Sequence, residues 1–306
     1  MKLMKVKLMN IKRLNIQSLL LILTSILMTL LPTISFAQTD FADTLKEASV
    51  GKQFVQPSRA EIQRAEALFA RLFNGERSAA LNAAWAEAGF DVLSADSGQL
   101  TLVVEQASQR AGRGFFVLRA GLPVMLQMPH SFKDELTREI GVSVFKRSQF
   151  SAAAWNTVPR QFEQNGQVID ADMAHLTNTY FIAFSRAFAR HYPQGNIVQL
   201  HGFDQSKRNS STAASAAAII SNGSDSASLM LKKLAVDLQQ KTKLSILVYP
   251  DDVRELGATT NTVAAALRDI GFTQFTHIEM SRGFRERLKR SHAWQLSLVN
   301  CLETAN

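Results

Sequence analysis

The sequence has little cysteine and lacks the motifs of two large enzyme classes. Cys301 is the only cysteine in 306 residues, so no disulfide bond can form within the chain. There is no P-loop and no Gly-x-Gly-x-x-Gly motif, which disfavours nucleotide binding. There is also no Gly-x-Ser-x-Gly elbow, which a serine hydrolase of the α/β type needs. Functions that depend on a nucleotide or on an activated serine are therefore disfavoured.

The first 37 residues have the pattern of an export signal. A basic segment that ends at Arg13 precedes an apolar run at residues 19–31, and a small-x-small site at 35–37 precedes Gln38. The run is short for a membrane-spanning helix, which needs about 20 residues. We therefore predict a cleaved signal peptide at residues 1–37, a periplasmic protein and no stable membrane span after cleavage. An uncleaved anchor is the alternative.

The positive charge of the chain lies partly in this segment. The full sequence has a formal net charge of +8, and the first 37 residues carry five of its 34 basic residues and no acid. The remainder has a net charge of +3, so the sequence pI of 9.7 is in part an export feature. Charge of this size does not indicate nucleic-acid binding.

The remainder reads as one α/β domain. Residues 38–57 are polar and mixed, and they predict a loose lead-in; residues 58–306 predict a single domain with an N-terminal helical and β extension at 58–119. Beyond this extension, short apolar strands alternate with amphipathic helices, which is typical of three layers around a mixed, mainly parallel sheet. The predicted strands lie at residues 90–93, 99–105, 114–119, 123–128, 151–155, 196–200, 217–221, 244–249 and 274–278. A loop is predicted after strand 151–155, followed by a helix at 175–191, and Ser58 with Glu61 predicts a capping box at the start of an earlier helix.

Polar residues follow three of the predicted strands. His130 comes after strand 123–128, His201 after strand 196–200 and Glu279 after strand 274–278. In an open α/β sheet, ligands bind beyond the carboxyl ends of the strands. Two imidazoles and a carboxylate, with Asp134 four residues after His130, suit a zinc ion that keeps one position open for water.

The predicted zinc ligands are His130, Asp134 and His201, with Glu279 as the general base. Glu135 is the alternative carboxylate ligand. If the segment after His130 is helical, a step of four residues returns to the same face, which favours Asp134. Each residue also has a reading without metal: the histidines as packed side chains, the acids as partners of a helix dipole, and Glu279 in an ion pair with a nearby arginine.

These motifs resemble a known family. Pro-His-x-x-x-Asp-x-x-Thr from Pro129, Leu-His-Gly from Leu200 and Ile-Glu-Met-Ser from Ile278, followed by Arg285, are similar to the zinc-carboxypeptidase-like amidohydrolases. The similarity is greatest to the N-formylglutamate amidohydrolase and poly-γ-glutamate hydrolase branch, and it spans residues 123–288. It implies a zinc-carboxypeptidase or phosphorylase/hydrolase-like α/β fold, one zinc ion, and hydrolysis of an amide beside a carboxylate.

Further residues are predicted to bind substrate. The resemblance places Arg285 near the family's substrate-facing arginine. Arg160, Asn156 and His175 lie between the ligand segments and are candidates by their own chemistry. The alternatives are a surface role for Arg160 and, for His175, a place at a helix N-terminus that Asp172 caps. The metallocarboxypeptidase His-x-x-Glu signature and its adjacent Asn-Arg pair are both missing, which leaves the substrate open. A small peptide, an N-acyl amino acid or a cell-wall fragment fits this pattern.

Two other functions remain alternatives at the level of the sequence. The Leu-His-Gly-Phe segment that begins at Leu200 resembles an oxyanion loop, which would suit a serine hydrolase despite the missing elbow. A non-catalytic periplasmic binding protein could keep the same fold. Glu279 disfavours this reading, because a binding protein needs no base at that position.

Overall fold

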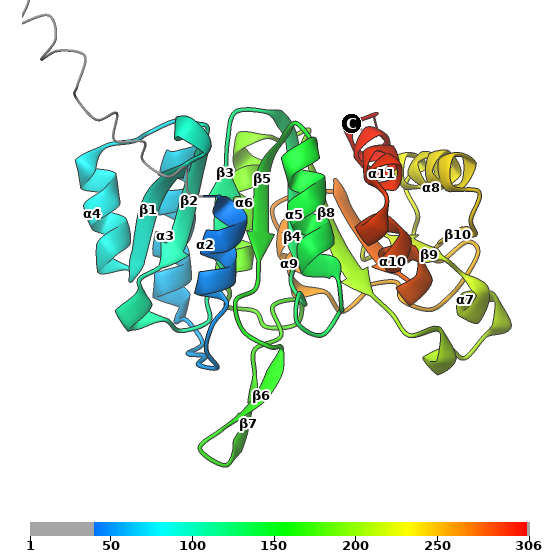
Figure 1. Ribbon diagram of the computed structural model, residues 1–306, viewed down its shortest axis with the longest axis horizontal. Helices are drawn as coiled ribbons and strands as arrows, with labels where there is room; N and C mark the ends of the chain where they lie inside the picture. Colours follow the sequence, from blue (N-terminus) through cyan, green and yellow to red (C-terminus); the bar gives the residue numbers. More distant parts are fainter. Residues whose placement is uncertain (1–39, 305–306) are drawn as a thin grey trace, which may run out of the picture. The chain divides into compact units, whose positions relative to one another are not determined.

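The computed structural model describes residues 40–304, and within this range nine strands form one sheet (Figure 1). Their order across the sheet is β1-β2-β3-β5-β4-β8-β11-β9-β10. The strands are β1 Phe90–Ala95, β2 Leu100–Glu105, β3 Phe115–Leu118, β4 Leu122–Met128, β5 Phe150–Trp155, β8 Asn196–Gly202, β9 Ala218–Ser221, β10 Ile246–Val248 and β11 Phe275–Met280.

The sheet is mixed, with a parallel centre. At the centre, β5, β4, β8 and β11 lie side by side and run parallel to one another. β1, β2 and β3 extend the sheet by antiparallel pairing beyond β5, and β9 pairs antiparallel with β11 on the other side. The extension at 58–119 thus contributes strands to the same sheet. The predicted α/β class with a mixed sheet is confirmed.

Helices cover both faces of the sheet and enclose two apolar cores (Figure 1). One core is covered by α2 Phe41–Ala48, α5 Thr137–Arg147, α8 Leu229–Thr242, α10 Arg282–Arg290 and α11 His292–Thr304. The other is covered by α3 Arg59–Phe73, α4 Ala79–Glu87, α6 Tyr180–His191 and α9 Thr262–Arg268. Short elements complete the described chain: η1 Asp96–Gly98, η2 Ala107–Gln109, η3 Gln205–Lys207, α7 Ser211–Ser215 and the hairpin of β6 Gln161–Gln164 and β7 Gln167–Asp170.

The predicted lead-in contains a helix, which is a correction. Asp40 caps α2 by accepting a hydrogen bond from the backbone N–H of Ala42 (2.9 Å). The Phe41 ring is fully buried, with its centroid 5.8 Å from those of both Phe145 and Trp155. The apolar residues of α2 recur at helical spacing, but a helix of eight residues gives a weak periodic signal. Its stability comes from packing against α5 and β5.

The segment between β5 and α6 was predicted as a loop and instead contains the β6–β7 hairpin. Asn165 and Gly166 form its turn with φ values of 52° and 74°, and two positive values are typical of a type I′ hairpin. The hairpin projects from the body of the domain (Figure 1). Helix α6 begins at Tyr180 rather than at 175, because the side chain of Thr179 caps the backbone N–H of Ile182.

The predicted signal peptide lies outside the described residues. Among residues 40–304, no helix combines the length and the apolar character that crossing a membrane requires.

Candidate metal centre

The predicted ligands meet at one edge of the sheet. β4, β8 and β11 are parallel neighbours, so their carboxyl ends open onto the same side. The chain passes from β4 through α5 to β5 on one side of β4, and then through α6 to β8 on the other side. The strand order therefore reverses between β4 and β8, where His130 follows the end of β4 and His201 is the penultimate residue of β8. Such a switch point is a common binding position in α/β folds.

His130, Asp134 and His201 form a compact buried cluster. The Oδ2 atom of Asp134 lies 3.5 Å from His130 Nδ1 and 3.4 Å from His201 Nδ1, and one ligand atom from each residue lies within 4.8 Å of the others. All three side chains are less than a tenth exposed. Two ligands that each stand about 2.0–2.1 Å from a tetrahedral zinc ion are roughly 3.3–3.4 Å apart. The spacing and the nitrogen and oxygen donors of the cluster fit such an ion.

The structure distinguishes the two candidate carboxylates. A turn follows His130, in which the backbone N–H of Asp134 donates to the carbonyl of His130 (2.9 Å), and helix α5 begins only at Thr137. This turn brings Asp134 back beside His130, as a helical step would. Glu135 instead points outward, with a side chain 63% exposed and 3.3 Å from Arg282. Asp134 is therefore the carboxylate that lies in the cluster.

Asp172 is a partner of His130 that the sequence reasoning missed. Its Oδ1 atom lies 2.7 Å from His130 Nε2, and it also faces His175 Nδ1 (3.1 Å) and, through Oδ2, Arg160 Nε (3.3 Å). A carboxylate at Nε2 holds a proton on that nitrogen, so the neutral imidazole presents its Nδ1 lone pair to the cluster. From the sequence, Asp172 had only a capping role beside His175. Its 42-residue separation from His130 leaves no local signal for the contact.

Gly202 allows Arg285 to lie across the end of β8. The backbone N–H of Gly202 donates to Asp134 Oδ2 (3.0 Å), and a Cβ at this position would stand 2.5 Å from Arg285 Cζ. The buried Arg285 donates from Nη1 to the carbonyl of Glu135 (2.5 Å). Its Nε atom is buried and has no partner among the described residues. The Arg285 guanidinium thus retains a free donor beside the cluster.

Glu279 and His277 lie beside the cluster, and His277 is a second residue that the sequence reasoning missed. The Oε2 atom of Glu279 is buried and has no partner in the described part of the chain. His277 Nε2 lies 3.7 Å from Glu279 Oε1, and His277 Nδ1 lies 3.4 Å from Ser221 Oγ. Side chains two residues apart on a strand share a face, so the position of His277 follows from that of Glu279. Ser221 is fully buried within β9 and lines neither cavity described below.

Burial perturbs the acid–base properties of these groups. Burial and then the negative charge of Asp134 raise the pKa of Glu279 to about 8. Burial opposes the charged form of His130, but its contacts with Asp134 and Asp172 raise its pKa to about 9. Burial lowers the pKa of His201, and that of His277 further. Perturbed pKa values that gather in one place are typical of functional sites.

The raised pKa of Glu279 predicts a pH-dependent stability difference in the metal-free protein. Between about pH 4.5 and pH 8 the unfolded chain ionises this glutamate while the folded chain keeps its proton, so folding loses stability as pH rises. Glu279→Gln removes this titration. The free energy of unfolding of the variant should therefore increase relative to wild type across this window and level off above about pH 8. Urea unfolding at a series of pH values measures it, and parallel curves would contradict the assignment.

Two adjoining cavities surround the cluster. The smaller, of about 240 Å³, is lined by His130, His201, His277, His175, Thr260 and Asn261, among others. The larger, of about 710 Å³, is lined by more basic than acidic side chains: Lys133, Arg160, Lys207, Arg208, Arg282 and Arg285 against Asp134, Glu135, Asp204 and Glu279. Both cavities are lined by Asp134, Arg160, Gly202, Leu256 and Glu279. The cluster and Glu279 therefore stand where a small polar cavity opens into a basic groove.

The predicted substrate-binding residues differ in their positions. Arg160 lines both cavities, His175 lines the smaller one and Arg285 lines the larger one. Asn156 differs from its prediction: it is fully buried, lines neither cavity, and uses its amide to hold the backbone N–H of Ser131 (2.8 Å) and the carbonyl of Val158 (2.6 Å). This side chain ties the turn after β4 to the end of β5.

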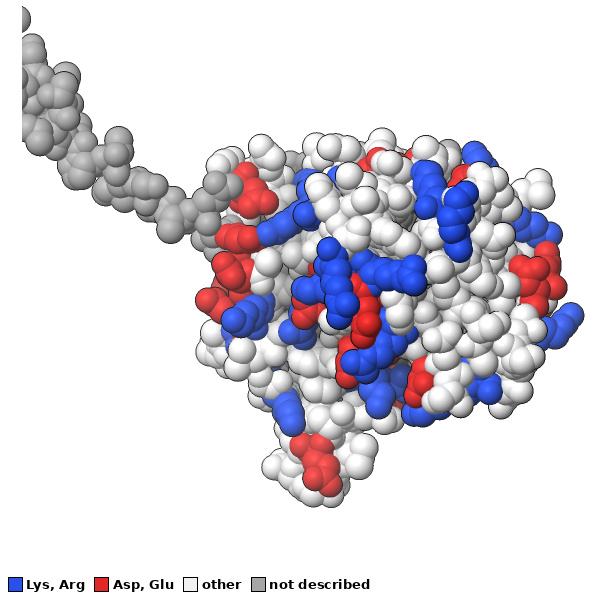
Figure 2. All heavy atoms as spheres, turned by 45° about the vertical axis from the view of Figure 1, so that its right-hand side comes forward, with Lys and Arg blue, Asp and Glu red and all other residues white. Residues whose placement is uncertain are grey.

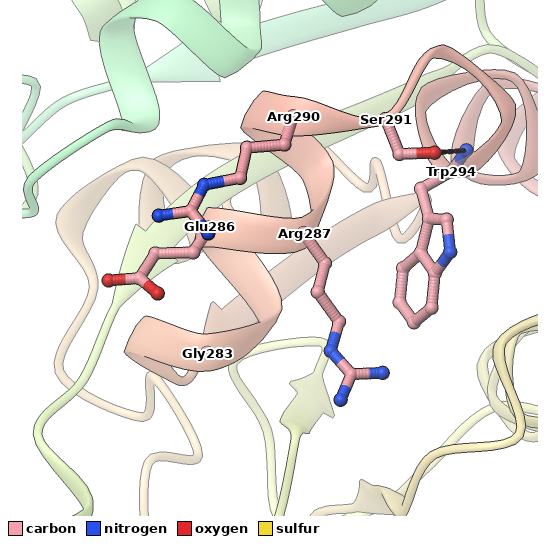
Figure 3. A pocket seen from close by; sticks show the side chains of 6 residues that line it. All are labelled: Gly283, Glu286, Arg287, Arg290, Ser291 and Trp294. Carbon is pink, nitrogen blue, oxygen red and sulfur yellow. Dashed lines mark hydrogen bonds between the residues drawn. The ribbon is translucent and has the colours of Figure 1, made fainter.

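Basic residues also extend over the outer surface of α10. Lys and Arg side chains gather near the middle of the face in Figure 2, with Asp and Glu side chains among them. A separate hollow of about 510 Å³ is lined by Gly283, Glu286, Arg287, Arg290, Ser291 and Trp294 (Figure 3). There the guanidinium of Arg287 lies 5.4 Å from the centre of the Trp294 ring. This hollow is lined by none of the predicted site residues.

No protein-family model and no curated protein matches the chain. A bacteriophage poly-γ-glutamate hydrolase structure matches at 11% identity and a TM-score of 0.40, over 65% of this chain and 90% of its own. Structures described as putative metallopeptidases come from Shewanella denitrificans (9% identity, TM-score 0.35, 83% of this chain and 94% of its own) and Shewanella amazonensis (12%, 0.28, 83% and 96%). Likeness of this degree identifies neither family nor function, and the family resemblance of the short motifs stays a prediction.

Proposed function

We propose that the protein is an exported, single-zinc hydrolase that cleaves an amide or peptide bond next to a carboxylate. The observation that carries this proposal is the convergence of His130, Asp134 and His201 with Glu279 around one cavity. The first three would hold the ion. A bound zinc ion lowers the pKa of a water molecule and polarises a carbonyl group.

Glu279 would act as the general base. Glu279 lines the same cavity as the cluster, and its Oε2 atom has no partner among the described residues, so the carboxyl group can accept a proton from an attacking water molecule there. The same group would then donate that proton to the leaving amine. A general base works best when its pKa lies near the working pH, and burial moves the pKa of Glu279 in that direction.

The basic groove supports an anionic substrate. Arginine guanidinium groups bind carboxylates through charge-assisted hydrogen bonds that are roughly twice as strong as neutral ones. Arg285 lines the larger cavity, and Arg160 lines both cavities. A small acidic peptide, an N-acyl amino acid or a cell-wall fragment would place its scissile carbonyl at the cluster and its carboxylate in the groove.

Matched substrates with and without a carboxylate test this function. Purified protein loaded with zinc should bind one ion per chain and hydrolyse N-acyl glutamates and short acidic peptides. Neutralising the adjacent carboxylate as an amide should lower kcat/KM by roughly 10–100-fold, the equivalent of one lost charge-assisted bond of about 1.5–3 kcal/mol. Absence of stoichiometric zinc, or equal rates on both substrate sets, would oppose the proposal. Binding without turnover would favour a periplasmic binding protein instead.

A further inference from the structure

A row of buried polar side chains crosses the sheet directly beneath the cluster. Gln127 of β4 stands opposite Gln199 of β8, which stands opposite His277 of β11. In the next row towards the strand ends, His201 stands opposite Glu279. Both glutamines are fully buried. Burying an amide without hydrogen bonds costs about 1–3 kcal/mol, so a row of this kind depends on complete hydrogen bonding.

The carbonyl of Phe181, at the Gln127 end of the row, sets the directions of the hydrogen bonds. Ser185 Oγ donates to the carbonyl of Phe181 (2.7 Å), so it can only accept from Gln127 Nε2 (2.8 Å). This orients the Gln127 amide with Oε1 towards Gln199, whose Nε2 donates to it (2.9 Å). The oxygen of Gln199 must then point the other way, towards α9 and His201.

A second backbone group imposes the same orientation from the other end. Asn261 caps α9 by accepting from the backbone N–H of Ala264 (3.0 Å), which leaves its Nδ2 to donate to Gln199 Oε1 (2.8 Å). His201 Nε2 lies 3.3 Å from this same oxygen. Because an amide oxygen only accepts, His201 must carry its proton on Nε2, and its Nδ1 lone pair faces Asp134.

We infer that Gln199, held in orientation by Gln127 and Asn261, is a positioning residue that fixes the tautomer of His201 with Nδ1 facing the cavity. The inference rests on the proposed function only in taking His201 as a zinc ligand. The tautomer itself belongs to the metal-free chain as well. Asn261 also lines the smaller cavity, so a residue of the cavity wall takes part in orienting the His201 imidazole.

The ring nitrogens of His201 and the zinc affinity of the chain together test this role. In ¹⁵N spectra of the metal-free protein at mildly alkaline pH, His201 should carry its proton on Nε2; a His201→Gln variant assigns the signal. Gln199→Met keeps the volume but removes the acceptor, so both tautomers should appear. Zinc affinity, measured by competition with a chelator, should fall by about 10–100-fold, the usual effect of losing a partner of a ligating histidine.

Two further variants separate positioning from general stability. Gln127→Met leaves Gln199 in place but frees the Gln199 amide to turn. The variant should therefore show a smaller shift of the His201 tautomer in the same direction as Gln199→Met. If Gln199→Met does not fold, Gln127→Met provides the test. Thr276→Val removes a buried hydrogen bond to Asn196 (3.2 Å) elsewhere in the sheet and should change neither tautomer nor affinity. A proton on Nδ1 of His201 in the wild type, or unchanged tautomer and affinity in the glutamine variants, would overturn the inference. Failure to bind zinc would contradict the proposed function but not this inference, because the tautomer of His201 can still be measured in the metal-free protein.

Discussion

Glu279→Gln is expected to lower kcat by roughly 10²–10⁴-fold while zinc still binds at one ion per chain. Positioned general bases contribute about this factor, and the glutamine amide cannot accept the proton from the attacking water. The variant keeps the size of the side chain. Glu279 lies outside the cluster of His130, Asp134 and His201, although one of its oxygens also lies within 4.8 Å of ligand atoms of His201 and His277. With the ion held by the proposed cluster, the affinity for zinc should change little. Steady-state kinetics on an acidic N-acyl substrate and metal analysis of the same sample measure both effects.

Glu139→Gln is the matched control for this prediction. Glu139 is an exposed glutamate in the first turn of α5 and lines neither cavity around the cluster. The same substitution there should leave kcat and zinc content near the wild-type values. If Glu279→Gln retained full turnover, another group would have to act as the base. If it lost its zinc, Glu279 would belong among the ligands.

His201→Ala is expected to weaken zinc binding by more than about 100-fold, beyond the 10–100-fold loss typical of an outer partner of a ligand. The substitution removes one of the two imidazoles that flank Asp134. Because zinc would bind the folded state and stabilise it by mass action, the rise in Tm that saturating zinc produces should disappear as well. Chelator competition gives the affinity, and thermal unfolding with and without zinc gives the stabilisation.

His130→Ala should behave in the same way, and His292→Ala provides the control. His292 is exposed at the start of α11 and lines neither cavity around the cluster. Loss of the zinc-induced rise in Tm in all three variants would mean that this loss is not specific to the cluster. Retention of full affinity in both cluster variants would remove the basis of the proposed metal site.

Several features of this protein follow from local sequence patterns alone. Apolar runs and helical periodicity locate most of the strands and helices, and Ser58 with Glu61 forms the predicted capping box at the start of α3. The position of His130 after one strand, and of His201 and Glu279 at the ends of two others, follows from the same patterns. These features are local, since each depends on residues a few positions apart.

Other features depend on which strands are neighbours, and only the tertiary structure decides that. The contact of His130 with Asp172 joins residues 42 apart, and that of Gly202 with Asp134 joins residues 68 apart. Asn156 was predicted to bind substrate, but its amide is hydrogen-bonded to Ser131, in the turn after β4, and to Val158. The burial of α2, too, depends on partners about 100 residues away in α5 and β5. The sequence by itself determined which chemical groups stand at the strand ends. The packing of β4, β8 and β11 side by side decided that these groups meet, because hydrogen-bond registers and buried contacts between distant segments have no local periodic signal.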